Sequence, residues 1–143
     1  MDLNKFFRFF TPIPEEQDDV DGLKILRNSP FYKIGMFTRL ILNGISFKNQ
    51  LIDFFSKSSE DLDLDGVDLA GEFMMYNRAY YWIKQLDWSD ELWVNDLRSV
   101  ADENLLTAIK LSIHFFEEQE EYEKCAFLKE VQDFVQNYLA VED

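Results

Sequence analysis

Residues 122–139, with the sequence YEKCAFLKEVQDFVQNYL, have the most regular helical pattern of the chain. Their apolar side chains recur at intervals of three or four residues, and these are Cys125, Leu128, Val131, Val135 and Tyr138. Lysine, glutamate and aspartate occupy many of the positions between them. One apolar face and one charged face are typical of a helix that packs against a core. The pattern therefore predicts a helix that closes the fold.

The segment before this helix has the same spacing. Its apolar side chains lie three or four residues apart, and they are Leu105, Leu106, Ile109, Ile113 and Phe116. Asp102 precedes them and is a residue type that caps helix N-termini. The acidic run Glu117–Glu121 follows and predicts a turn. Two amphipathic helices joined by a short turn predict an antiparallel hairpin at this end of the chain.

The sequence around the predicted turn, EYEKCAFLK at residues 121–129, resembles the core of the UVR motif of bacterial excision-repair proteins. It is also similar to half of a tetratricopeptide unit. The resemblance extends over about residues 105–139 and rests on an aromatic residue, charged residues, a pair of small residues and a leucine. Both families use the motif as a helical hairpin, and the UVR hairpin serves protein–protein contact. The resemblance thus implies a hairpin and a docking role.

The remaining apolar segments also predict helices. Ser29-Pro30 is a favourable helix start, and Asn43-Gly44 is expected to end that helix before Ser46 caps the next one. A long helix is expected at about residues 69–86, and Ser89 is expected to cap a short one after it. We therefore predict an all-α fold, a single small bundle of five to six helices ending in an antiparallel hairpin.

An alternative to this fold remains open, because Asn-Gly is also a common hairpin turn. Both sides of Asn43-Gly44 show partial alternation of apolar residues. The alternative is an α+β fold with a β-hairpin at about residues 36–51.

The N-terminal residues differ in composition from the rest. Residues 1–14 contain four phenylalanines together with Lys5 and Arg8, and they end in Thr11-Pro12-Ile13-Pro14, which breaks a helix. We expect an aromatic, basic arm at residues 1–14 and one acidic helical domain at residues 15–143. The arm is expected either to fold back on the core or to dock into a partner.

The net charge of -14 is concentrated in one region. Residues 1–57 carry 8 Lys/Arg and 7 Asp/Glu, whereas residues 58–143 carry 6 and 21. Such a field repels phosphate backbones and anionic lipids, so we expect no direct nucleic-acid or membrane binding and a partner protein with a basic surface. One cysteine, no signal peptide and no apolar run of about 20 residues predict a cytoplasmic protein.

An acidic segment has the spacing of a calcium loop. Asp-x-Asp-x-Asp-Gly at residues 61–66, followed by five residues and a glutamate, resembles the EF-hand family. By that resemblance the calcium ligands are Asp61, Asp63, Asp65, the carbonyl of Val67 and Glu72. Asp68 departs from the family, which has an aliphatic residue there. The other interpretation is an ordinary acidic connection between two helices.

Catalytic motifs are not evident in the sequence. The single histidine, His114, and the single cysteine, Cys125, could meet across the predicted hairpin, but no third group to orient them is apparent. No glycine-rich phosphate loop is present either. We predict a non-enzymatic protein with no catalytic residues and, calcium apart, no cofactor.

Aromatic residues cluster near the middle of the chain. Around residues 73–83 the expected helix is apolar nearly all round, so it lies at the centre of the bundle or leaves an aromatic patch outside. Tyrosine and tryptophan beside acidic residues are usual in interfaces. The predicted partner-binding residues are Tyr81, Trp82, Trp88, Trp93, Glu117, Glu118, Glu120 and Glu121.

These patterns favour a non-enzymatic inhibitor or adaptor that presents an acidic, aromatic-containing surface to a basic partner. In charge and size the chain is similar to immunity proteins against nuclease toxins and to phage-encoded inhibitors that mimic nucleic acid. The alternatives are a calcium-binding module at residues 61–72 and a structural subunit of a larger assembly, such as a viral one.

Overall fold

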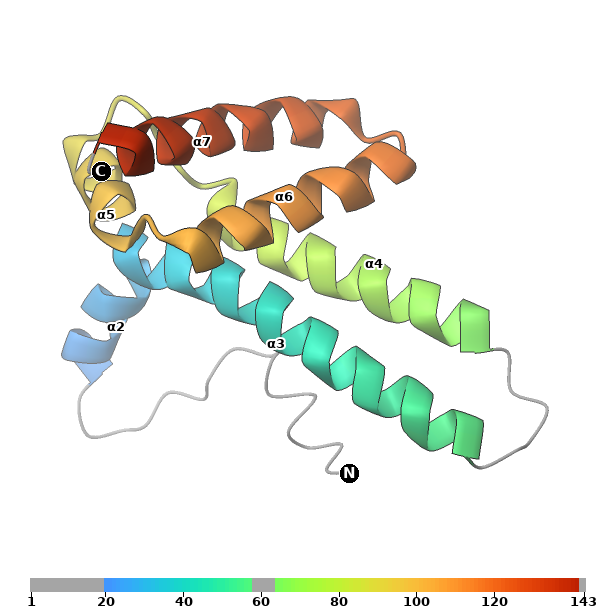
Figure 1. Cartoon of the computed structure of the whole chain (residues 1–143). Coiled ribbons are helices and arrows are strands. Elements are labelled where there is room, and N and C mark those ends of the chain that lie inside the picture. Colours follow the sequence, from blue (N-terminus) through green and yellow to red (C-terminus); the bar gives the residue numbers. More distant parts are fainter. Residues whose placement is uncertain (1–19, 58–63, 142–143) are drawn as a thin grey trace.

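The computed structural model describes residues 20–57 and 64–141 and is all-α within them. It contains six helices there: α2 (Val20–Asn28), α3 (Pro30–Lys57), α4 (Leu64–Ile83), α5 (Glu91–Val100), α6 (Glu103–Glu118) and α7 (Tyr122–Val141) (Figure 1). The predicted all-α bundle with a final helical hairpin is confirmed. The predicted arm at residues 1–14 lies outside the described residues.

Helix α3 corrects two predictions about the middle of the chain. It runs unbroken through Asn43-Gly44 and Ser46, so the expected helix end there was wrong, as was the β-hairpin at residues 36–51. The predicted start is confirmed, because the Ser29 hydroxyl accepts a hydrogen bond from the Tyr32 amide at 3.2 Å. Tertiary packing overrides the weak helix propensity of Asn-Gly at this position.

The reason for glycine at position 44 lies in α4. A Cβ atom on Gly44 would stand 2.8 Å from Cγ of Met75 and would also overlap the Met75 sulfur. Met75 is only 2 % exposed, so its side chain has little space to move away. The missing side chain of Gly44 therefore permits the close approach of α3 and α4.

We expect Gly44→Ala to lower the free energy of unfolding by about 1–3 kcal/mol, because the added methyl group overpacks the contact with Met75. Gly35 is the matched control in the same helix, since a Cβ there meets no atom within 4 Å. Gly35→Ala should raise the free energy of unfolding by about 1 kcal/mol, because alanine has the higher helix propensity. Urea unfolding of both variants checks the pair, and a stabilising Gly44→Ala would contradict the close approach.

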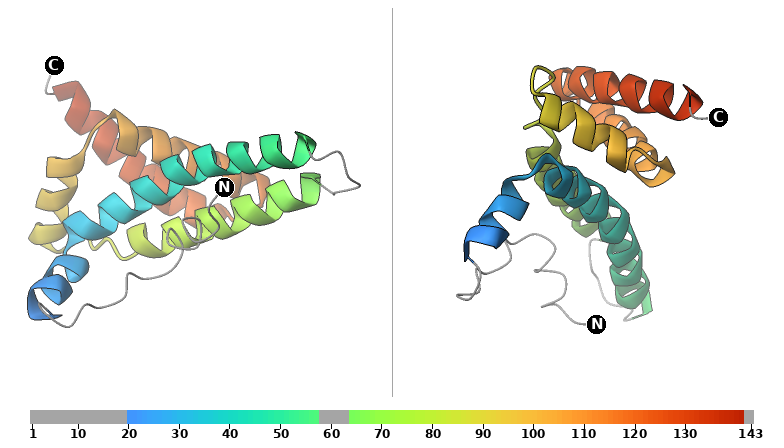
Figure 2. Two further views of the ribbon diagram at one scale, coloured as in Figure 1. Left: turned by 90° about the horizontal axis from the view of Figure 1, so that it is seen from below. Right: turned by 90° about the vertical axis from the view of Figure 1, so that its left-hand side faces the viewer.

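The helices form two antiparallel pairs that pack on each other. Helices α3 and α4 make one pair, α6 and α7 make the other, and the second pair crosses over the first (Figures 1 and 2). Helix α5 contacts both α3 and α7, and α2 packs against α3. Buried side chains from α3 to α7 form one connected core.

Aromatic rings fill the junction between the pairs. Tyr76 of α4 stacks on Phe115 of α6 with centroids 4.5 Å apart. Tyr80 meets Phe116 edge-on at 5.5 Å and Phe127 of α7 at 6.0 Å. Offset and edge-on geometries are the favourable ones for aromatic pairs. These contacts fix how the α6–α7 hairpin sits on α4.

The predicted helix cap is right for α6 and wrong for α5. The Asp102 carboxylate accepts a hydrogen bond from the Leu105 amide at 2.8 Å, which confirms the predicted cap of α6. For α5 the cap is Asp90, which accepts from the Leu92 amide, so the predicted cap at Ser89 was wrong by one residue. The Ser89 hydroxyl instead donates a hydrogen bond to the Asp87 carboxylate at 2.6 Å, and the Ser89 amide donates a second one at 2.9 Å. The two hydrogen bonds lower the pKa of Asp87.

The turn between α6 and α7 is a Schellman motif. The amide of Glu121 donates to the carbonyl of Phe116 at 2.9 Å, and the amide of Glu120 donates to that of Glu117 at 3.0 Å. Glu120 has φ of 60°, which makes it the one non-glycine residue with positive φ in the described part of the chain. Glycine is the usual residue at this position, so the turn holds a charged side chain where none is normally found.

Candidate functional site

Helix α4 has two apolar faces. One is buried in the core and includes Met75, Tyr76, Ala79 and Ile83. The other faces solvent, with Leu69 54 %, Phe73 52 %, Met74 46 % and Tyr81 53 % exposed. The sequence offered two outcomes for this helix, a central position or an external patch. Both occur, because α4 is apolar nearly all round over residues 73–83.

The exposed face of α4 is hollowed. An open groove of about 740 Å³ follows residues 69–81 of the helix, and its wall on one side includes Gln119 from the α6–α7 turn. Its floor is apolar, with the small Ala70 between the larger side chains of the face. We call this feature the α4 groove.

Lys124 joins the α6–α7 turn to the side of the α4 groove. Its ammonium group donates a hydrogen bond to Oδ1 of Asn77 at 2.8 Å and forms an ion pair with Glu121 at 2.9 Å. The same group lies 4.9 Å from the ring centroid of Phe116 and 5.3 Å from that of Tyr80. Cation–π and hydrogen-bond contacts together hold the turn against α4.

The acidic residues predicted to bind a partner lie together in this turn. Glu117 forms an ion pair with Lys129 at 3.2 Å, and the Glu118 carboxylate lies 3.1 Å from Nε2 of His114. Glu120 is exposed and has no ion-pair partner among the described residues. Gln119, the turn residue that lines the α4 groove, thus lies between Glu118 and Glu120 in the sequence of this acidic turn.

The opposite edge of the α4 groove carries a positive charge. Asn77 faces α7, and Arg78 follows it by about 100° around the helix, on the side away from the hairpin. Arg78 is exposed and lines the groove. The edge away from the hairpin thus carries an arginine, and the acidic α6–α7 turn contributes Gln119 to the other edge.

The predicted aromatic residues do not form one patch. Tyr81 lines the α4 groove, with the Lys84 ammonium 5.4 Å from its ring, and Trp82 is partly buried between the rings of Tyr81 and Tyr32. Trp88 is partly exposed but packs on Phe134 of α7. Trp93 is 7 % exposed and belongs to the core, so it is not available to a partner.

Sequence reasoning missed Leu69, Phe73 and Met74 as site residues. The signal for them was the apolar circumference of residues 73–83, which implies that some apolar side chains must face outward. The sequence could not show which face packs inward, because both faces are equally apolar.

Part of the predicted calcium loop is helical. Asp61 and Asp63 lie outside the described residues, whereas positions 65, 67 and 72 all belong to α4, which begins at Leu64. In a helix the carbonyl of residue 67 faces the amide of residue 71 rather than a bound ion. Among the described residues, no three acidic, histidine or cysteine side chains gather to hold a metal. Calcium binding stays a prediction.

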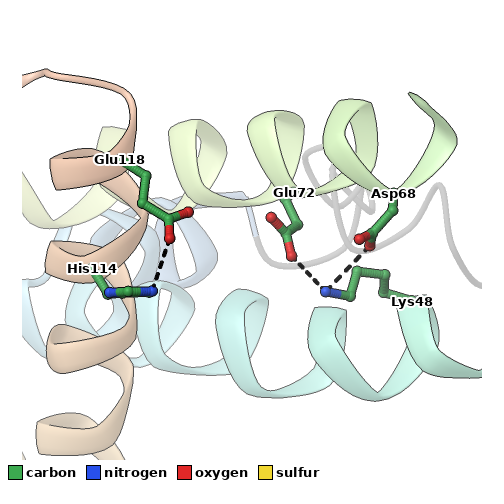
Figure 3. A network of polar contacts seen from close by, with 5 residues as sticks. All are labelled: Lys48, Asp68, Glu72, His114 and Glu118. Carbon is green, nitrogen blue, oxygen red and sulfur yellow. Dashed lines mark hydrogen bonds and ion pairs between the residues drawn. The ribbon is translucent and has the colours of Figure 1, made fainter. Parts of the chain in front are cut away.

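Glu72 interacts with α3 instead. The Lys48 ammonium lies 2.5 Å from the Glu72 carboxylate and 3.3 Å from that of Asp68 (Figure 3). Partial burial disfavours the charged ammonium, but the hydrogen bonds to the two carboxylates outweigh this, so the pKa of Lys48 is raised. This cluster ties α3 to the N-terminal half of α4 on the side away from the groove.

His114 and Cys125 do not form a catalytic pair. The His114 ring points outward to Glu118 (Figure 3), and its side chain is 73 % exposed. The Cys125 thiol is buried and lies 3.7 Å from the Ile113 carbonyl. Burial, with the nearby charge of Glu117, raises the pKa of this thiol, which suppresses the reactive thiolate.

No helix in the described segments has the length and apolar character required to cross a membrane.

Comparison with known proteins gives no relative: no protein-family model, curated protein or solved structure matches this chain.

Proposed function

We propose that this protein is a non-enzymatic inhibitor or adaptor that binds a basic site on another protein. The observation that carries the proposal is the α4 groove, where half-exposed apolar side chains lie beside the acidic α6–α7 turn. Protein interfaces combine an apolar centre with a polar rim, and contiguous exposed apolar surface marks such sites.

The charge distribution supports a basic partner. With 21 acidic and 6 basic residues in the region 58–143, the field attracts cationic surfaces and accelerates their encounter. Apolar and aromatic side chains such as Phe73 and Tyr81 then slow dissociation once they are buried. The acidic residues thus raise the association rate, and the apolar side chains lower the dissociation rate.

The backbone conformation of Glu120 also supports a binding role for the turn. A non-glycine residue in the left-handed region costs about 1–2 kcal/mol, and glycine would avoid that cost. Strained residues of this kind concentrate at functional positions. We interpret Glu120 as a carboxylate kept in the turn for binding.

The experiment compares two charge reversals in the full chain. Glu118→Lys with Glu120→Lys alters the turn, whereas Glu130→Lys with Asp133→Lys changes the net charge equally on the exposed face of α7. Each protein is immobilised on a support and incubated with native lysate at low and at high salt. The retained proteins are then quantified by mass spectrometry.

We expect the unaltered chain and the α7 control to retain a basic protein at low salt. The turn variant should lose this protein. Its retention should also fall at high salt, because exposed charges are screened. Retention that depends only on net charge, equally reduced in both variants, would contradict the proposal, as would the absence of any retained basic protein.

A further inference from the structure

Resting on the function proposed above, we propose that the α4 groove binds an amphipathic helix of the partner protein. The flank of that helix facing the α6–α7 turn is cationic, and the flank facing Arg78 is anionic. The groove, its mainly apolar lining, the acidic turn beside Gln119 and Arg78 on the far side are the features that specify this occupant.

The dimensions of the α4 groove fit a short helix. Leu69 and Tyr81 are twelve residues apart, which corresponds to about 18 Å along the axis of α4. A partner helix of three to four turns presents apolar residues at i, i+3, i+4 and i+7 over a comparable length. Ala70 in the floor leaves space for a side chain of the partner between Leu69 and Met74.

The chemistry of the floor favours a helix over an extended peptide. One mode in which an extended segment binds is the pairing of its backbone with a sheet edge, and the described residues form no strand that could provide it. Leu69, Ala70, Phe73 and Met74 offer no side-chain hydrogen-bonding group to the backbone of an extended peptide along this half of the groove. A helix satisfies its own backbone and needs only an apolar face, so it is the form that this surface can accept.

The charges at the two edges define the flanks. Glu118 and Glu120 flank Gln119, the turn residue that lines the groove, and Arg78 lines the groove on the side away from the turn. Complementary charges across an interface fix register and reject mismatched partners. A second copy of this chain is disfavoured as the occupant, because each copy has a net charge of -14.

The probes are fluorescein-labelled helical peptides of 18 residues that share one leucine face. The first has lysines on one flank and glutamates on the other, the second has lysines on both, and the third has glutamates on both. A fourth has the composition of the first with its leucines scrambled. Binding to the full chain is measured by fluorescence anisotropy.

We expect the first peptide to bind most tightly and the third most weakly, with no measurable binding of the scrambled peptide. Phe73→Ser and Tyr81→Ala should each weaken the first peptide about tenfold or more, as for buried anchors. Leu92→Ser on α5 is the matched control, since Leu92 is 56 % exposed and lies outside the groove, and it should leave binding unchanged. Arg78→Glu should reverse the order of the first two peptides.

Crosslinking from a photo-leucine in the first peptide to the unaltered chain locates the contact without any substitution. Crosslinks on residues 69–81 or on Gln119 are expected, and crosslinks elsewhere overturn the proposal. Equal binding of the scrambled peptide also overturns it. So does a dimer of the unaltered chain that Phe73→Ser dissociates, because the occupant is then a second copy. If turn-dependent retention of a basic protein persists while every peptide fails, the helix is wrong and the proposed function stands.

Discussion

Phe116→Ala is expected to lower the free energy of unfolding by about 3–5 kcal/mol, the range for removal of a buried phenylalanine. Phe116 has no exposed surface and lies where the two helix pairs meet. Its ring is 5.5 Å from that of Tyr80 and 5.3 Å from that of Phe115, and the Lys124 ammonium lies 4.9 Å from its centroid. The substitution leaves a cavity and removes these contacts together.

Equilibrium unfolding in urea measures the effect, and two variants bracket it. Phe116→Leu keeps most of the volume and should lose clearly less than the alanine variant. Tyr122→Ala removes an aromatic ring that is 65 % exposed at the start of α7, and should change the free energy by no more than about 0.5 kcal/mol. A Phe116→Ala loss as small as that of Tyr122→Ala would show that the helix pairs do not meet at this ring.

Stability is expected to fall by about 2–3 kcal/mol between pH 10 and pH 12 because of Tyr76, at about 1.4 kcal/mol per pKa unit. Burial, with the charge of Glu72, raises the pKa of this phenol from 10.0 to about 12. Above pH 10 the unfolded chain loses the proton and the folded chain keeps it, so ionisation stabilises the unfolded state. Below pH 10 both states are protonated, and this contribution to pH dependence vanishes.

Tyr76→Phe tests the assignment, because it removes the titrating hydroxyl and keeps the ring. Its free energy of unfolding should decline less over this pH range than that of the unaltered protein. Burial also raises the pKa of Tyr80, so part of the decline remains in the variant. Tyr81→Phe is the control at a tyrosine that is 53 % exposed, and an equal effect of both substitutions would contradict the assignment to the buried Tyr76.

The C-terminal hairpin could be predicted because its determinants are local. The apolar spacing of residues 105–139 and the cap at Asp102 lie within the helices they define. The helix end predicted at Asn43-Gly44 was wrong because the determinant at Gly44 is Met75, which lies 31 positions further along the chain. Local propensity cannot report a close approach that depends on a partner helix.

The site was predictable to a similar extent. The acidic turn could be found from charge alone, whereas the contacts of Glu117, Glu118 and Glu121 with Lys129, His114 and Lys124 could not. Exposure of the aromatic residues depends instead on which face each helix turns inward. Trp93 was predicted to be available but lies in the core, where the Lys33 ammonium of α3 is 5.8 Å from its ring.

The arrangement in two antiparallel pairs also determines how this chain reaches its fold. In each pair the helices are neighbours in the sequence, α3 with α4 and α6 with α7. Contacts between sequence neighbours need only short loops to close, and helical proteins rich in them fold in about microseconds to milliseconds. We expect each hairpin to form early, so that the collision of the two preformed hairpins at the aromatic junction limits the folding rate.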